Sequence, residues 1–150
     1  MATTFNLYDQ WRDIVADPTR ASAISGTLKC AIVTAAYTVN QNTHDFWDDV
    51  SANEVSGTGY TAGGNACATP TWTGPDGSGV LTFDSDDPAT WSQNAAGFSN
   101  GRRAILYYDT GTGGTSRLVG YSNDFGADAG NVAGDFSVAA NASGWYTSAR

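Results

Sequence analysis

The chain has 150 residues, with seven basic and fifteen acidic side chains and a net charge of −8 at pH 7. This length predicts one domain, large enough to form a hydrophobic core of its own. The acidic charge argues against partners that present phosphates, so we expect neither nucleic acid nor a membrane among the partners.

Targeting signals are not evident in the sequence. The start, Met-Ala-Thr-Thr, lacks the basic and apolar regions of a secretion signal, and no apolar run approaches the roughly 20 residues that cross a bilayer. We therefore expect the chain to be made in a cytoplasm, where Cys30 and Cys67 would be half-buried strand residues. The redox state of these two thiols stays open.

Residues 5–16 are the one segment with helical periodicity. Leu7, Trp11, Ile14 and Val15 fall on one face of a helix, and polar side chains fall on the other. Asn6 is the predicted N-cap, and Asp17-Pro18 ends the helix. About three turns are too short to be stable alone, so the apolar face must pack on the rest of the domain.

The remaining sequence is predicted to form short strands separated by glycine, proline and asparagine turns. The strands are expected at 27–37, 79–84, 102–109, 116–124, 134–141 and 144–148, with a helical turn at 45–50 that Thr43 or Asp45 would cap. Such strands without βαβ alternation predict a mainly β fold. We expect a single domain over 1–150, in which an N-terminal arm and short amphipathic helix (1–26) precede a jelly-roll-like antiparallel β-sandwich (27–150).

A glycine-rich loop at 57–62 matches the pattern G-x-G-x-x-[GA] of dinucleotide-binding loops. That pattern binds a pyrophosphate only where a buried strand enters the loop and a helix leaves it. Here the lead-in is polar and acidic, and two prolines follow, so we expect no nucleotide and no other cofactor. The glycines are expected to supply positive φ angles and close backbone approach in a surface loop that presents Tyr60.

Other candidate chemical sites are weak. His44-Asp45 places a base beside a carboxylate, but neighbouring residues do not face each other as a catalytic triad requires. Asp84, Asp86 and Asp87 form an acidic turn without the glycine and terminal glutamate of an EF-hand loop, which leaves Ca²⁺ binding there open. We therefore predict no catalytic, cofactor or metal residues and expect that the chain is not an enzyme.

Aromatic side chains near turns are the more informative feature. Trp72 and Trp91 lie in short runs beside turns, where tryptophan suits a protein interface or a sugar platform, or caps the ends of a core. Together with the N-terminal segment and the glycine loop they give the predicted interface residues: Leu7, Trp11, Tyr60, Trp72 and Trp91.

Several segments carry a resemblance to a known family: 43–64 (THDFWDDVSANEVSGTGYTAGG), 102–121, 124–128 and 133–144. They resemble small structural virion proteins of tailed bacteriophages, of the capsid decoration or cement type, and the similarity spans nearly the whole chain. The resemblance implies a non-enzymatic β module present in many copies on a phage particle. It brings no catalytic residues and does not distinguish head from tail.

Three functions are compatible with these observations. The first is a decoration protein on the outer surface of the capsid, clamping neighbouring subunits of the major capsid protein and assembling with itself, most simply as a homotrimer. The second is a tail or tail-tip component that serves as a receptor- or carbohydrate-binding module. The third is a glycan hydrolase, which the scarcity of Glu and His disfavours. We expect the first.

Overall fold

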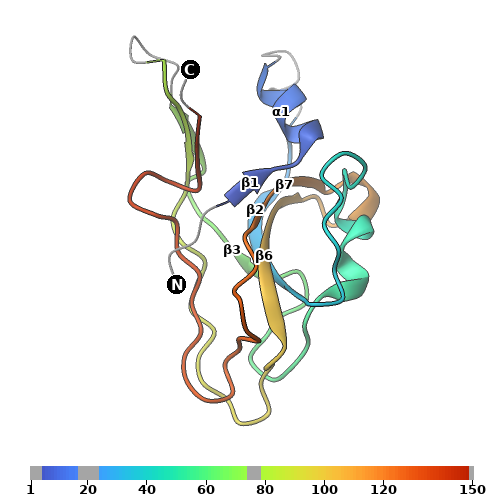
Figure 1. Cartoon of the computed structure of the whole chain (residues 1–150), viewed down its shortest axis with the longest axis vertical. Helices are drawn as coiled ribbons and strands as arrows, with labels where there is room; N and C mark the ends of the chain where they lie inside the picture. Colours follow the sequence, from blue (N-terminus) through green and yellow to red (C-terminus); the bar gives the residue numbers. More distant parts are fainter. Residues whose placement is uncertain (1–4, 17–23, 74–78, 149–150) are drawn as a thin grey trace.

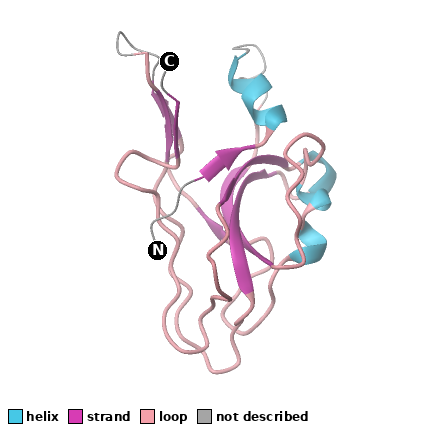
Figure 2. Ribbon diagram, in the orientation of Figure 1, coloured by secondary structure: helices cyan, strands magenta, loops and turns pink. Residues whose placement is uncertain are grey.

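The fold is known from a computed structural model, which describes residues 5–16, 24–73 and 79–148. Two antiparallel sheets form most of it, with little helix, which confirms the predicted mainly β, sandwich-like architecture (Figures 1 and 2). The larger sheet lies in the middle of the molecule, and the smaller one stands beside it.

Five strands form the larger sheet, in the order β1-β7-β6-β2-β3. Their bounds are Phe5–Leu7 (β1), Arg117–Ser122 (β7), Gly101–Asp109 (β6), Thr27–Thr34 (β2) and Asn65–Ala66 (β3). The long central pair, β2 and β6, sets the register, with Lys29 opposite Tyr107 and Ile32 opposite Ala104. Three strands, β4 (Thr71–Thr73), β5 (Leu81–Asp84) and β8 (Tyr146–Ser148), form the smaller sheet in the order β4-β5-β8.

Both faces of the larger sheet are covered, which explains why its central strands are apolar at nearly every position. One set of alternating side chains, including Leu28, Cys30 and Ile32, packs toward the smaller sheet and its Phe83. The other set includes Ala31, Val33, Ile105 and Tyr107. It packs against Tyr8, Tyr37 and Val50, the latter two from the excursion between β2 and β3. That excursion contains two short 3₁₀ helices, η1 (Trp47–Asp49) and η2 (Ser51–Asn53), and a third, η3 (Gly113–Thr115), precedes β7.

The N-terminal helix is shorter than predicted. Residues 5–7 form β1, paired with β7, and α1 spans Asp9–Ala16 with the carbonyl of Tyr8 accepting from the amides of Trp11 and Arg12. Asn6 therefore lies in a strand and does not cap the helix. The burial of Trp11 and Ile14 confirms that the apolar face of α1 packs on the domain, while the side chain of Val15 lies outside the described residues.

Other predicted elements changed in extent. Residues 134–141 form no strand and make only isolated bridges, such as Phe136 with Trp91. The strand predicted at 27–37 ends at Thr34, and β4 was not predicted as a strand. The turn at 45–50 is η1, where the carboxylate of Asp49 accepts from the amides of Asp45 and Phe46. That bond reaches backward from inside the turn, so neither Thr43 nor Asp45 is the capping residue.

Candidate functional site

The glycine-rich loop at 57–62 is followed by turns and by β3, with no helix at its exit. Gly59 has a φ of 81°, and a Cβ on Gly57 would collide with the backbone of Gly97 and Phe98. These two glycines therefore serve a positive φ angle and a close backbone approach, as predicted. Without a helix N-terminus the loop has no dipole to direct at a phosphate.

Tyr60 points inward, which corrects the expectation that the loop presents it at the surface. Its hydroxyl donates to Oε1 of Glu54 at 2.7 Å and accepts from the amide of Ile32 at 2.9 Å. Its ring stacks on Trp91, with 5.9 Å between ring centroids, and meets Phe98 edge-on. The amide of Ile32 in β2 lies beyond the end of β3 and takes the Tyr60 hydroxyl as its acceptor. A buried amide needs such an acceptor, which explains why the Tyr60 side chain points into the fold.

Glu54, the one glutamate in the sequence, holds this loop in place. Its Oε1 also accepts from the amide of Gly63 at 2.7 Å, and the hydroxyl of Tyr107 donates to the carbonyl of Gly63 at 2.8 Å. Burial raises the pKa of Glu54, while the hydrogen bonds from Tyr60 and Gly63 oppose that rise. The carboxylate is thus used for internal hydrogen bonds within the fold.

An ion pair lies beside this cluster, where Nζ of Lys29 is 2.7 Å from Oδ2 of Asp109. The hydrogen bond from Lys29 lowers the pKa of Asp109, and the amide of Gly111 lowers it further. The pair joins β2 to β6, so it stabilises the central register of the sheet.

Three of the five predicted interface residues are core residues. Leu7, Trp11 and Trp91 are each no more than 2% exposed in the single chain. A side chain packed inside its own domain offers no area to a partner, so the interface expectation is corrected for these three. Trp72 is only half-buried, but its ring stacks on Phe83 at 4.5 Å on the inner face of the smaller sheet.

His44 takes part in a chain of hydroxyl groups that leads into the core. Its Nδ1 lies 2.9 Å from the hydroxyl of Tyr37, which is 2.7 Å from the hydroxyl of Tyr8. Asp45, next to His44 in the sequence, uses its main chain to bond Asp49 and Leu118. In the described part of the chain, the side chains of the predicted base–carboxylate pair, His44 and Asp45, therefore do not bond to each other, because the His44 ring bonds to Tyr37.

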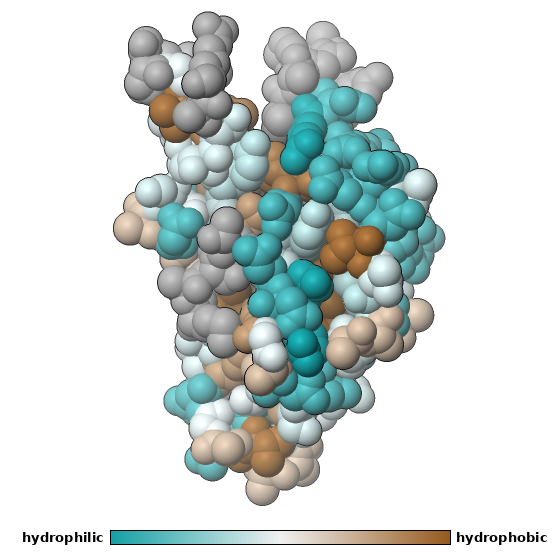
Figure 3. Space-filling model, viewed as in Figure 1, coloured by the Kyte–Doolittle hydropathy of each residue, from teal (hydrophilic) through white to brown (hydrophobic). Residues whose placement is uncertain are grey.

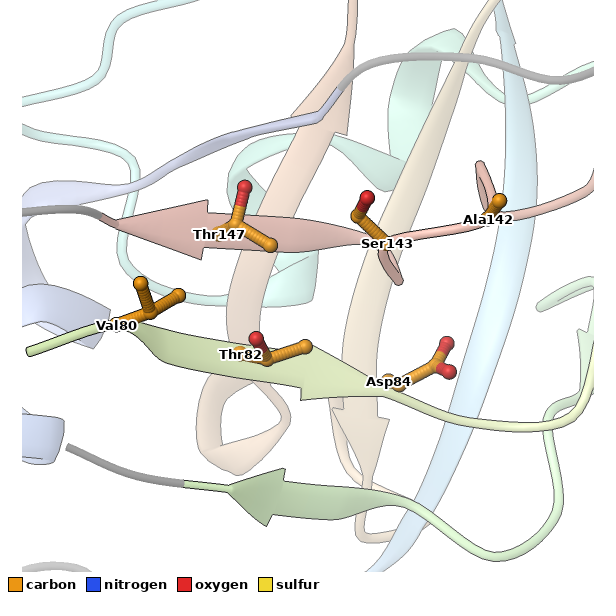
Figure 4. Close-up of a pocket in the computed structure, with 6 residues that line it drawn as sticks. All are labelled: Val80, Thr82, Asp84, Ala142, Ser143 and Thr147. Carbon is orange, nitrogen blue, oxygen red and sulfur yellow. The ribbon is translucent and has the colours of Figure 1, made fainter. Parts of the chain in front are cut away.

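The acidic turn at 84–87 does not converge on one point. Oδ1 of Asp87 accepts from the amide of Ala140, whereas Asp84 lies on the outer face of the smaller sheet (Figure 4). Within the described ranges, no group of three or more His, Cys, Asp or Glu side chains is arranged to hold a metal ion. Cys30 and Cys67 are free thiols and buried.

A shallow hollow of about 520 Å³ lies over the outer face of the smaller sheet (Figure 4). It is lined by Val80, Thr82, Asp84, Ala142, Ser143 and Thr147. It offers hydroxyl groups and one carboxylate to solvent. In the space-filling view the coloured residues at the left, over the smaller sheet, are mostly pale, whereas those at the upper right are mostly hydrophilic (Figure 3).

Trp47 is an exposed-aromatic candidate that reasoning from the sequence missed. Its ring stacks on Tyr107 with 4.3 Å between centroids and an angle of 7°, and it remains partly exposed. Next to it, the guanidinium of Arg117 lies 5.2 Å above the ring of Phe46. The only sequence signal for this site was the pair of aromatic residues in the run Phe46-Trp47-Asp48-Asp49. A single helical turn has no periodicity from which to tell which of the two rings faces solvent.

No helix in the described part of the chain is long and apolar enough to cross a membrane. Comparison with protein-family models, curated proteins and solved structures gave no match to this chain.

Proposed function

We propose that this chain is a structural protein of a phage virion that decorates the outer surface of the capsid and clamps neighbouring copies of the major capsid protein. The resemblance of 43–64 and 133–144 to phage virion proteins motivates the proposal. A clamp needs surface area, defined loop shapes and polar groups that are already satisfied, and the fold supplies these.

The observation that carries the proposal is the internal use of polar side chains to fix the surface loops. Asn131 is fully buried, and its Oδ1 accepts from the amide of Phe98 at 2.9 Å. Its Nδ2 donates to the carbonyl of Ser92 at 2.8 Å. Glu54 does the same for the 57–64 loop. Loops fixed in this way present a preorganised surface, which lowers the entropy cost of binding a rigid partner.

Charge supports an external position. The inside of a filled head faces condensed DNA, which would repel a module of net charge −8. The outer surface imposes no such penalty. A small closed oligomer is expected, because a head-to-tail contact that does not close would polymerise before reaching the capsid.

Immunogold labelling of intact particles tests the position directly, with antibody raised against this chain. We expect gold over the whole head surface, and label restricted to the tail would overturn the proposal. A second measurement follows DNA release from heated particles that lack the chain. Loss of a clamp lowers the temperature of release and leaves adsorption to cells unchanged.

A tail or tail-tip module, binding a receptor or a carbohydrate, is the second candidate. Burial of Trp91 removes one of its two expected platforms, and the observation in its favour is now the partly exposed Trp47 stacked on Tyr107. If this candidate is correct, Trp47→Ala should reduce adsorption of particles to cells without changing the temperature of DNA release.

A further inference from the structure

The two sheets have four outer edges, and three of the strands that form them contact other parts of the chain. On β3, Nδ2 of Asn65 donates to the carbonyl of Ala89, so the chain at Ala89 lies next to this edge. The edges formed by β1 and β8 are in contact with each other, with Phe5 4.9 Å from Trp145 between ring centroids. On β4, pairing within the described part of the chain is limited to β5 on one side.

On the side of β4 that no other described strand pairs with, the backbone of Trp72 faces away from β5. The carbonyl of Phe83 accepts from the amide of Trp145, so the Phe83 peptide faces β8, and that of its neighbour Asp84 faces β4. A bond from Oγ1 of Thr71 to the carbonyl of Asp84 agrees with this direction. Thr71 is opposite Asp84 and Thr73 is opposite Thr82, so the backbone N–H and C=O groups of these threonines point toward β5. The N–H and C=O of Trp72 between them therefore point outward.

The side chains of β4 lack the usual protection of an exposed edge. Natural edge strands are blocked by lysine, other charges or bulges, yet residues 55–75 contain no charged side chain. Thr71 and Thr73 are exposed on the outer face, and Trp72 is anchored on the inner face against Phe83 and Trp11. The strand is thus neutral, and its central side chain is packed against other aromatic rings.

We propose that β4 pairs with β4 of a second copy of this chain, antiparallel, across a two-fold axis that passes between the two Trp72 residues. An antiparallel hydrogen-bonded pair exchanges two N–H···O bonds between the same two residues. A two-fold axis makes these bonds identical, because Trp72 directs both its donor and its acceptor to that side. The two smaller sheets then form one six-stranded sheet.

The self-complementary pattern of the edge, with Thr71 and Thr73 on either side of Trp72, favours a second copy as the occupant. Two molecules of net charge −8 repel each other over most of their surfaces, so they can meet only where neither presents a charge. In this register Thr71 lies opposite Thr73 of the second copy, and the nearest acidic side chain of the sheet, Asp84, is one strand back. Threonine pairs across strands are favourable, whereas like charges there are not.

The contact is independent of the proposed function, since it requires only two copies in solution. It is small, because three residues form the edge, and we expect the weak association of an interface below the standard size. Its two-fold symmetry differs from the three-fold symmetry expected for a decoration protein. Such a weak contact becomes populated where neighbouring copies are held at a high local concentration, as on a particle surface.

The test measures molar mass by sedimentation as protein concentration rises to about 1 mM, the range in which weak contacts populate. We expect the wild-type mass to rise from 15.6 kDa toward twice that value. The double variant Thr71→Lys, Thr73→Lys places two lysines opposite each other at both ends of the pair and should remain at 15.6 kDa. The variant Thr71→Lys, Thr73→Glu should still associate, because each new lysine then lies opposite the new glutamate of the other copy.

A matched control is Thr82→Lys with Thr147→Lys, which adds the same charge to the same face but away from the β4 edge. It should associate like the wild type. Amide exchange gives a second measurement, because the N–H of Trp72 should become protected only at high protein concentration. A wild type that stays monomeric at the highest concentration, a trimeric mass, or association that persists in the double-lysine variant would each overturn the proposal.

Discussion

Two buried tryptophans differ in whether their indole N–H has a partner among the described residues, and this difference predicts unequal costs for the same substitution. Trp11 and Trp145 are each at most 1% exposed. Nε1 of Trp145 donates to Oγ of Ser85 at 2.7 Å, whereas Nε1 of Trp11 is buried with no hydrogen-bond partner among residues 5–16, 24–73 and 79–148. On folding, the indole N–H of Trp11 therefore loses its hydrogen bond to water and gains none from the described residues.

Replacement by phenylalanine should separate the two sites. In both, the smaller ring leaves a cavity that costs about 1 kcal/mol. At Trp11 the change also removes an unpaired buried donor, which returns about 1 kcal/mol, so the net cost of Trp11→Phe should be near zero. At Trp145 the change breaks a hydrogen bond, which adds about 1 kcal/mol to the cost. Trp145→Phe should thus be less stable than Trp11→Phe by about 2 kcal/mol.

Urea unfolding at equilibrium measures these differences as free energies of unfolding. Trp11→Ala serves as a reference and should cost about 3–5 kcal/mol, because it removes the ring that stacks on Tyr108 and packs near Trp72. If Trp11→Phe proves as destabilising as Trp145→Phe, the reasoning about the unpaired donor is wrong. If Trp11→Ala is silent, α1 does not pack on the core.

Three further predictions concern the loops. The folded-state pKa of Glu54 is raised above the ordinary value of 4.5, so the contribution of Glu54 to stability is fully present below that value and is lost as the pH rises through the folded-state pKa. Glu54→Gln should therefore flatten the dependence of the free energy of unfolding on pH in this range. An unchanged dependence would contradict the raised pKa of Glu54. Asn131→Ala should cost roughly 3 kcal/mol, since it leaves the buried amide of Phe98 unpaired, while the exposed control Asn100→Ala should be near neutral in the same melts. Equilibrium dialysis against millimolar NAD or ATP should show no uptake, and saturable binding lost on substitution in 57–62 would refute our interpretation of that loop.

Local periodicity predicted the fold class and much of the core. The alternation and apolar runs of 27–34 and 101–109 are directly visible in the sequence, and both segments are central strands. Phe136 and Val138 are buried, as an alternating pattern suggests, yet 134–141 is not a strand, because a ladder needs successive paired residues and the described pairings there are isolated bridges, such as Phe136 with Trp91. Periodicity reports which side chains are buried, and strand pairing depends on distant residues.

The predicted start of the helix, at residue 5, was wrong for a related reason. Leu7 and Trp11 are four residues apart, which fits a helical face, but Leu7 is buried through its pairing with Gly120 in β7. That contact spans more than a hundred residues and leaves no trace in the local pattern.

The candidate site was less predictable than the fold. Tyr60 was expected at the surface because glycines surround it, and nothing local reveals that its hydroxyl completes the amide of Ile32. Glu54 is six residues away in sequence and is distinguished only by being the sole glutamate. The position of β4 at an edge of the smaller sheet, as the described residues show it, is a property of the sheet order and cannot be obtained from residues 71–73 alone.

The sheet order also determines when the molecule can fold during synthesis. The N-terminal strand β1 has to wait for β7, since Phe5 pairs with Ser122. In the smaller sheet, β4 and β5 are made early, but β8 and Trp145 come last in chain order. Pairings of such long sequence separation fold slowly, and until then Phe83 and β5 are unprotected on the nascent chain. The interval between making β5 and making β8 is therefore when aggregation or chaperone binding is most expected.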